Sequence, residues 1–90
     1  MDSDQQPEVY DFPAIIPIVV IGKNEDDFEG LVVEIILREI HPSQLRGVER
    51  KPSSGDKYLS VSVTLEVESR DQLNTLYGAL RADARVRMII

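Results

Sequence analysis

Cysteine is absent from this chain of 90 residues, which excludes disulfide bonds and metal sites built on thiolates. The fold must therefore depend on side-chain packing, as suits a reducing compartment. No stretch approaches the roughly 20 apolar residues that a membrane-spanning helix needs. Residues 1–6 are acidic and polar, unlike the basic and then apolar start of an export signal. We therefore expect a cytoplasmic protein.

Groups suited to catalysis are also scarce. His41 is the only histidine, and at a predicted helix end before Pro42 it is expected to be a favourable helix-terminal charge rather than a general base. Asp26 and Asp27 lie at the start of the same helix. We interpret them as capping residues rather than metal ligands, because one short acidic cluster lacks the ligand spacing of a calcium loop. No nucleophile with a base and no tuned pair of carboxylates is evident. We therefore predict no catalytic residue, no cofactor and no metal site, and a chain that is not an enzyme.

Basic residues are outnumbered, with 10 lysines and arginines against 16 aspartates and glutamates and a net charge of −6. Residues 1–45 carry two basic and ten acidic side chains, and residues 46–90 carry eight basic and six acidic ones. The acidic excess is expected to serve solubility. Because an acidic protein repels phosphates, we do not expect general affinity for nucleic acid, although the second half could carry a local basic strip.

The chain is long enough for one small core and leaves no room for a second domain, with 42% hydrophobic residues. Residues 1–11 are polar, contain Pro7 and lack periodicity. They are predicted to form a flexible acidic lead-in whose end Tyr10 and Phe12 tether. Residues 12–90 are predicted to form a single domain.

Two segments have strong strand patterns. Polar and apolar residues alternate over residues 58–67, which predicts a strand with one face on a core. Its other face carries Tyr58, Ser60, Ser62, Thr64 and Glu66. Residues 14–21 are largely β-branched, and both their odd-numbered and their even-numbered positions are apolar. This pattern predicts a strand covered on both faces. Because Pro17 has no backbone donor, we expect the regular part of this strand to begin at Ile18.

Two helices are predicted from capping signals and periodicity. Residues 24–27 supply a side-chain cap and acids suited to the positive end of a helix dipole, and the first helix is expected to close at residues 41–42. Its apolar arc is unusually wide, so it is expected to contact more than the sheet beneath it. The residues that widen the arc are Val33, Leu37 and Ile40. The second helix begins at the capping pattern Ser69-x-x-Gln72 and has one narrow apolar stripe.

The order of the elements predicts the fold. Residues 45–51 and the turn cluster at residues 52–56 complete a hairpin with the alternating strand, and residues 85–90 form a closing strand. The order strand, helix, strand, strand, helix, strand predicts an α+β fold, the ferredoxin-like βαββαβ plait, with a four-stranded antiparallel sheet and two helices on one face. The first and third strands are expected at its centre and the second at an edge.

The closing strand alternates basic and apolar residues. If Val86 and Met88 point inward, then Arg85, Arg87 and Ile89 join the polar side chains of the third strand on the open face of the sheet.

The hairpin turn at residues 51–55 contains a lysine, two serines and a glycine, as phosphate-binding loops do. A P-loop precedes a helix, however, whereas this segment precedes a strand. We interpret it as a turn, with anion binding by its backbone amides as the alternative.

Four groups of residues match a known sequence pattern. They are Asp11-Phe12-Pro13, Lys51-Pro52-Ser53-Ser54 with Tyr58 and Ser60-Val61-Ser62, Leu76-Tyr77, and Val86-Arg87-Met88-Ile89-Ile90. Together they resemble the YbeD-like family of small uncharacterised bacterial proteins over residues 10–90, and the Lys-Pro-Ser-Ser hairpin is the most specific part. Gly55 stands one place earlier than the family pattern has it, and the lead-in is longer and more acidic.

This resemblance implies a ferredoxin-like plait similar to the ACT domains, small regulatory modules that bind amino acids and associate through sheet edges or helices. It implies no established reaction and no active site.

An interaction role is favoured by a first strand apolar on both faces, a first helix with a wide apolar arc and an exposed strand face rich in serine and threonine. A chain this small cannot easily cover that surface alone. We therefore expect a regulatory or adaptor domain that binds a protein partner, including a second copy in a homodimer, or a small metabolite. The candidate surface consists of Lys51, Ser53, Ser54, Tyr58, Ser60, Ser62 and Arg87.

Two alternatives stay open. The helices could press together over the sheet while residues 8–13 cover its open face, so that no partner is needed. The plait could also bind RNA, which this fold does by stacking bases on aromatic rings of its central strands. Tyr58 is the only aromatic in the regular part of either central strand, and the acidic total opposes phosphate binding.

Overall fold

The computed structural model describes residues 10–90, and the predicted lead-in at residues 1–11 therefore lies mostly outside the described residues. Four strands, two α-helices and a short 3-10 helix follow one another in this range. They are β2 (Ala14–Lys23), α1 (Phe28–Glu39), η1 (Pro42–Gln44), β3 (Leu45–Pro52), β4 (Tyr58–Val67), α2 (Arg70–Arg81) and β5 (Val86–Ile89). Tyr10 and Phe12 pack against the core ahead of β2.

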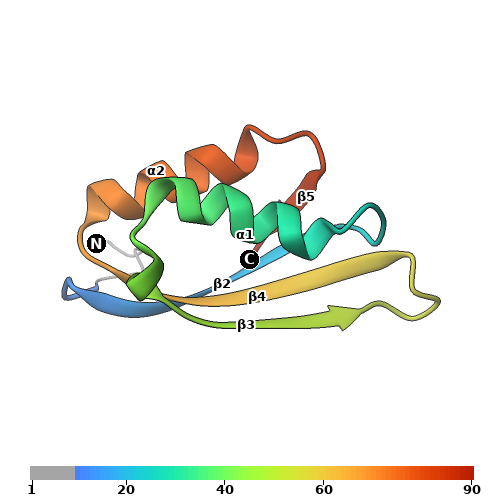
Figure 1. Cartoon of the computed structure of the whole chain (residues 1–90), viewed down its shortest axis with the longest axis horizontal. Coiled ribbons are helices and arrows are strands. Elements are labelled where there is room, and N and C mark those ends of the chain that lie inside the picture. Colours follow the sequence, from blue (N-terminus) through green and yellow to red (C-terminus); the bar gives the residue numbers. More distant parts are fainter. Residues whose placement is uncertain (1–9) are drawn as a thin grey trace, which may run out of the picture.

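The strands form one antiparallel sheet in the order β3-β4-β2-β5. Both helices lie on the same side of the sheet, so the molecule has two layers (Figure 1). This arrangement confirms the predicted ferredoxin-like plait. The two central strands, β2 and β4, are the two with the strongest patterns in the sequence, because a central strand must satisfy neighbours on both sides.

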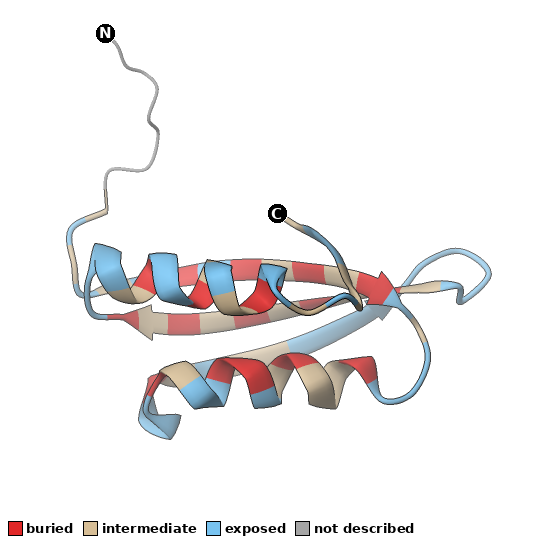
Figure 2. Cartoon of the chain, turned by 90° about the horizontal axis from the view of Figure 1, so that it is seen from above, coloured by how far each residue is buried: buried red, intermediate tan, exposed pale blue. Residues whose placement is uncertain are grey.

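The core lies between the sheet and the helices. Alternate residues of β2 and β4 are buried there, and buried residues recur along the facing sides of both helices (Figure 2). The buried side chains are Ile16, Ile18, Val20, Phe28, Val32, Ile35, Ile36, Ile40, Leu59, Val61, Val63, Leu65, Val67, Leu73, Leu76 and Leu80. Full burial of one such side chain stabilises a fold by about 1.5–3 kcal/mol, so packing can hold this chain together without disulfide bonds.

The start of β2 differs from the prediction. The strand begins at Ala14, and Pro17 lies within it opposite Thr64 of β4. Val19 exchanges both backbone hydrogen bonds with Ile90, which follows β5. The other odd-numbered residues of β2, including Pro17, therefore also direct their backbone groups toward the β5 side and away from β4. The missing N–H of Pro17 therefore costs the β2–β4 ladder nothing.

The capping residues of both helices were predicted correctly. Asp27 caps α1, and its Oδ1 accepts a hydrogen bond from the backbone N–H of Gly30 at 3.1 Å. Ser69 caps α2 through a hydrogen bond from the N–H of Gln72, also at 3.1 Å. The wide apolar arc of α1 packs against α2 as well as against the sheet, and Leu37 stays exposed at its edge.

Candidate functional site

The face of the sheet opposite the helices carries an uncovered apolar strip. The strand register places Met88 beside Ile21, and Ile90 beside Val19. The apolar strip consists of Ile15, Pro17, Val19, Ile21, Met88 and Ile90. Ile15, Met88 and Ile90 are 54%, 56% and 69% exposed. Large apolar side chains thus gather on one face, where no described residue covers them.

A row of hydroxyl groups borders the apolar strip. This hydroxyl strip consists of Tyr58, Ser60, Ser62 and Thr64 of β4, all half-buried. The register with β3 places Lys51 opposite Ser60. Within residues 10–90, no side chain hydrogen-bonds to the hydroxyl of Ser60 or Ser62. The open face therefore grades from apolar side chains, through available hydroxyls, to the charged edge strand β3.

Ser53 has a structural role in the hairpin. Its Oγ accepts a hydrogen bond from the N–H of Tyr58 at 3.0 Å, and its own N–H donates to the carbonyl of Tyr58 at 2.8 Å. Gly55 and Asp56 have positive φ angles of 83° and 60°, as a tight turn requires. These contacts favour the interpretation of this segment as a turn. Ser54 is exposed at its tip.

Replacing Ser53 with alanine is expected to lower the free energy of unfolding by about 1 kcal/mol, the usual contribution of one such hydrogen bond. Urea unfolding measures this loss, and Ser54→Ala is the matched control. Equal stability of the two variants would show that the Ser53 hydroxyl does not hold the turn.

Arg87 lies apart from the hairpin residues of the predicted surface. Six predicted surface residues lie together on β3, β4 and their connecting turn: Lys51, Ser53, Ser54, Tyr58, Ser60 and Ser62. Arg87 lies on β5, at the opposite edge of the sheet. Since strands are spaced by about 4.8 Å, the two edges are roughly 14 Å apart. The predicted surface residues therefore lie at both edges of the sheet.

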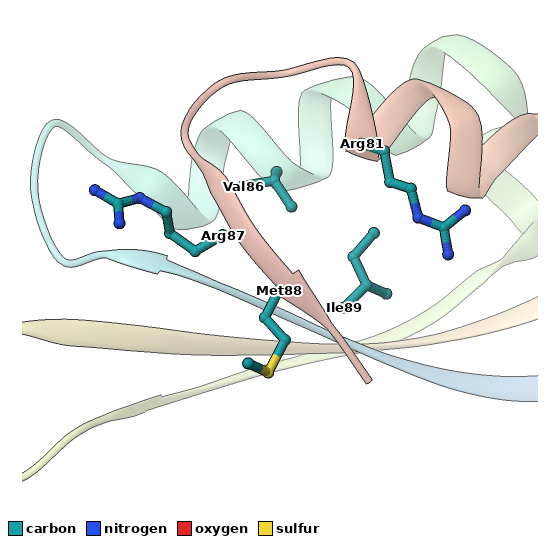
Figure 3. A pocket seen from close by; sticks show the side chains of 5 residues that line it. All are labelled: Arg81, Val86, Arg87, Met88 and Ile89. Carbon is teal, nitrogen blue, oxygen red and sulfur yellow. The ribbon is translucent and has the colours of Figure 1, made fainter.

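The predicted alternation along β5 is also wrong. Val86 pairs with Gly22 on the helix side, as predicted, but Met88 pairs with Ile21 on the open face. Ile89 pairs with Val20 and so lies on the helix side. A bulge at Arg87 inserts one extra residue and shifts the alternation. Figure 3 shows Met88 and Val86 on opposite sides of β5, with Arg87 extending toward the loop after β2.

Arg85 also lies on the helix side rather than on the open face. Its guanidinium carbon is 5.7 Å from the centre of the Phe28 ring, and its Nη2 donates to the backbone carbonyl of Glu25. The cation–π contact and the hydrogen bond fix this side chain against the start of α1.

His41 lies after the end of α1 rather than in its last turn. It is the N-cap of η1, and its Nδ1 accepts a hydrogen bond from the N–H of Ser43 at 3.2 Å. The predicted helix-terminal role is therefore wrong in detail, because Pro42 starts a new 3-10 turn in which His41 is the capping acceptor.

Gln44 is a buried polar residue that the sequence patterns did not indicate. Its side-chain oxygen accepts from the N–H of His41 at 2.8 Å, and its Nε2 donates to the carbonyl of Glu66 at 2.8 Å and to Oε1 of Gln72 at 3.0 Å. These bonds join η1, the end of β4 and the start of α2. A glutamine two residues after a helix-starting proline was the available signal.

Two small hollows adjoin β5 and share Arg87. The β5 hollow, of about 220 Å³, is lined by Arg81, Val86, Arg87, Met88 and Ile89 (Figure 3). The loop hollow, of about 160 Å³, is lined by Lys23, Glu25, Ala84, Arg85 and Arg87. Both are smaller than the roughly 300–1,000 Å³ of typical small-molecule sites.

Two further observations concern residues 10–90. In this range no three histidine, aspartate or glutamate side chains gather closely enough to hold a metal ion. No helix here is long and apolar enough to cross a membrane.

Solved structures with a similar fold include ACT domains. The chain is similar to the ACT domain from GTP pyrophosphokinase of Chlorobium tepidum, with a TM-score of 0.67 and 17% identity over 84% of this chain and 94% of that one. It is similar to protein HP0495 from H. pylori, with a TM-score of 0.70 and 20% identity over 100% of this chain and 94% of that one. These likenesses define the fold as an ACT-like α+β domain.

Within this class, the chain belongs to the family described as "Protein of unknown function (DUF493)", which matches residues 7–90. It is 36% identical to the UPF0250 protein RSc0326 of Ralstonia nicotianae, over 89% of this chain and 82% of that protein. It is 35% identical to a UPF0250 protein of Paraburkholderia phymatum, over 98% of this chain and 99% of that protein. The resemblance to the YbeD-like family is thereby confirmed.

Proposed function

We propose that this chain is a non-enzymatic, cytoplasmic regulatory or adaptor domain that binds a protein partner across the open face of its sheet. The observation that carries the proposal is the apolar strip, which no described residue covers. Contiguous exposed apolar surface of this kind marks protein-binding sites in soluble domains. The ACT domain from GTP pyrophosphokinase shows that a similar fold forms part of a larger enzyme, which supports a regulatory role here.

The composition of the face suits a protein interface. Interfaces have an apolar centre enriched in tyrosine and methionine and a polar rim. Here Met88 lies in the apolar strip, Tyr58 lies in the hydroxyl strip, and the ion pair of Arg46 with Glu66 lies toward the β3 edge. A partner with a flat apolar surface and groups that hydrogen-bond to serine fits this arrangement.

Size and charge support a protein as the ligand. The hollows of about 220 and 160 Å³ are too small to enclose a typical metabolite. Two copies of a chain with a net charge of −6 repel each other. We therefore favour a different protein over a small metabolite or a second copy.

RNA binding is less well supported by the geometry. A plait that binds RNA stacks bases on aromatic rings along its central strands. On β2 and β4 the one aromatic side chain is Tyr58, the first residue of β4. The remaining positions of the face offer aliphatic side chains and small hydroxyls, which do not make a stacking surface.

Two lysine substitutions on opposite sides of the molecule test the proposal. Ile15→Lys places a charge in the apolar strip, whereas Leu37→Lys places the same charge on α1, where Leu37 is 37% exposed. We expect Ile15→Lys to weaken partner binding about tenfold, because an unpaired charge must lose water in the interface. Leu37→Lys should change it less than twofold.

The measurement is quantitative pull-down from a bacterial extract, followed by titration of the purified partner against both variants. Light scattering on the unliganded chain checks for self-association. A partner that binds both variants equally, or a strict monomer that recovers no partner, would contradict the proposal.

A further inference from the structure

The outer edge of β5 presents unpaired backbone groups. β5 is the last strand of the sheet, and its residues bond only to β2. Ile90 exchanges both backbone hydrogen bonds with Val19, so the preceding residue, Ile89, directs its N–H and C=O outward. Among the strands of residues 10–90, none lies on that side. This edge can therefore accept another strand.

Four basic side chains line the two hollows beside β5, although the chain as a whole is acidic. Arg81 in the last turn of α2 and Arg87 line the β5 hollow, and Lys23, Arg85 and Arg87 line the loop hollow. The nearby carboxylates are Glu25, which lines the loop hollow, and Asp83, whose Oδ1 accepts from the N–H of Arg85. Basic side chains thus outnumber carboxylates here, the reverse of the balance in the whole chain.

Two of these basic residues lack the carboxylate partners that three arginines have elsewhere in the described chain. Arg38, Arg46 and Arg50 each form an ion pair with a glutamate. Within residues 10–90, neither Arg81 nor Arg87 forms an ion pair. Arg81 instead lies over the Tyr77 ring, with its guanidinium carbon 5.2 Å from the ring centre, so no carboxylate of the described residues neutralises the charge of Arg81 or Arg87.

We propose that the outer edge of β5 binds a short, extended, acidic segment of a partner protein, which adds a fifth strand to the sheet. Such a segment lies about 4.8 Å from β5 and pairs with the backbone of Ile89. Figure 3 shows Arg81 on the helix side of the sheet and Met88 on the opposite side. Side chains alternate between the two faces of a strand. In a segment of alternating acidic and apolar residues, the acidic side chains would therefore lie on the same side as the arginines. The apolar side chains would lie on the other side, next to the apolar strip.

Charge decides between this occupant and a second copy. Antiparallel pairing of β5 with β5 of another copy brings two sets of arginines together, and like charges on neighbouring strands destabilise pairing. Charge also distinguishes β5 from the other edge strand. On β3, Arg46 and Arg50 are paired with Glu66 and Glu29. Lys51 is the one basic residue of β3 without an ion pair among residues 10–90, so fewer unneutralised positive charges lie at this edge than beside β5.

The probe is a capped hexapeptide of alternating glutamate and valine, titrated against the whole isotope-labelled chain by NMR. The matched control is the same peptide with lysine in place of glutamate. We expect the acidic peptide alone to shift the amides of β5 and to slow hydrogen exchange of the Ile89 amide.

Variants locate the site. Arg87→Glu and Arg81→Glu are each expected to weaken the acidic peptide about tenfold, because each reversal replaces an attraction with a repulsion at the interface. Lys51→Glu, at the opposite edge, should change the affinity less than twofold. Ile15→Lys should also leave the affinity for the acidic peptide unchanged. Failure of the edge-site inference is therefore distinguishable from failure of the proposed function, which the Ile15→Lys variant tests.

Three outcomes would overturn the inference. One is equal affinity for the acidic and basic peptides. Another is binding without slower exchange at Ile89, which would mean that no strand is added. The third is a dimer in analytical ultracentrifugation that Arg87→Glu alters, which would assign the edge to a second copy. Circular dichroism spectra of the variants confirm that each is folded.

Discussion

Replacing Gly22 with alanine is expected to lower the free energy of unfolding by about 3 kcal/mol, at the upper end of the range for overpacked cores. A Cβ at this position lies 2.5 Å from the backbone oxygen of Arg85 and 2.5 Å from the Phe28 ring. The ring is buried, with 1% of its surface exposed, and a backbone oxygen cannot rotate away. The loss should appear in urea unfolding and should lower the melting temperature by about 12–24 °C.

Gly78→Ala is the matched control. Gly78 lies within α2, and a Cβ there meets nothing within 4 Å. Because alanine favours the helix over glycine, this variant is expected to gain about 0.5–1 kcal/mol. A Gly22→Ala variant as stable as the parent would contradict the close approach of β2, β5 and α1 at this point.

A second substitution separates the two contacts of Gly22. Phe28→Leu removes the ring but leaves the carbonyl of Arg85 in place, so Gly22→Ala should cost less in that background. We expect the two effects to be non-additive by about 1 kcal/mol, as is usual for residues in contact. Strict additivity would show that the ring does not contribute to the clash.

Gly22 also links the fold to the proposed edge site. It pairs with Val86, next to the bulge at Arg87. Any side chain at position 22 therefore displaces the start of β5, and with it the backbone that would pair with an acidic segment. The single glycine that closes β2 in the sequence is thus needed for the geometry of the neighbouring strand.

The fold could be predicted from the sequence because its strongest patterns belong to its most constrained elements. β4 alternates over its full length, since one face meets the core and the other does not. Ser69 and Asp27 cap the two helices as their residue types indicate. These signals are local, so a single sequence contains them.

What could not be predicted depends on contacts between distant segments. Pro17 fits inside β2 only because its parity directs it away from β4, which the register with Ile90 determines. Met88 faces outward because a bulge shifts β5, and a regular alternation of basic and apolar residues gives no sign of one. The predicted strand order already places the closing strand at the edge opposite the hairpin, so the separation of Arg87 from the hairpin residues could be predicted, whereas the bulge at Arg87 could not.

Replacing Gln44 with methionine is expected to lower the free energy of unfolding by about 2 kcal/mol, because buried groups left without partners cost about 1–3 kcal/mol each. The variant keeps the length of the side chain, which is 6% exposed, but leaves the N–H of His41 and the carbonyl of Glu66 without their bonds.

Gln72 provides the control for this network. Its Oε1 accepts from Gln44 and from the N–H of Glu68, at 3.0 and 2.9 Å. Gln72→Met alone is expected to cost about 1 kcal/mol, since it removes weaker and more exposed bonds. In the double variant the shared bond is lost only once, so the combined loss should fall short of the sum by about 0.5–1 kcal/mol. If urea unfolding gives Gln44→Met the stability of the parent, then apolar packing alone joins η1 to α2, and the buried amide is dispensable.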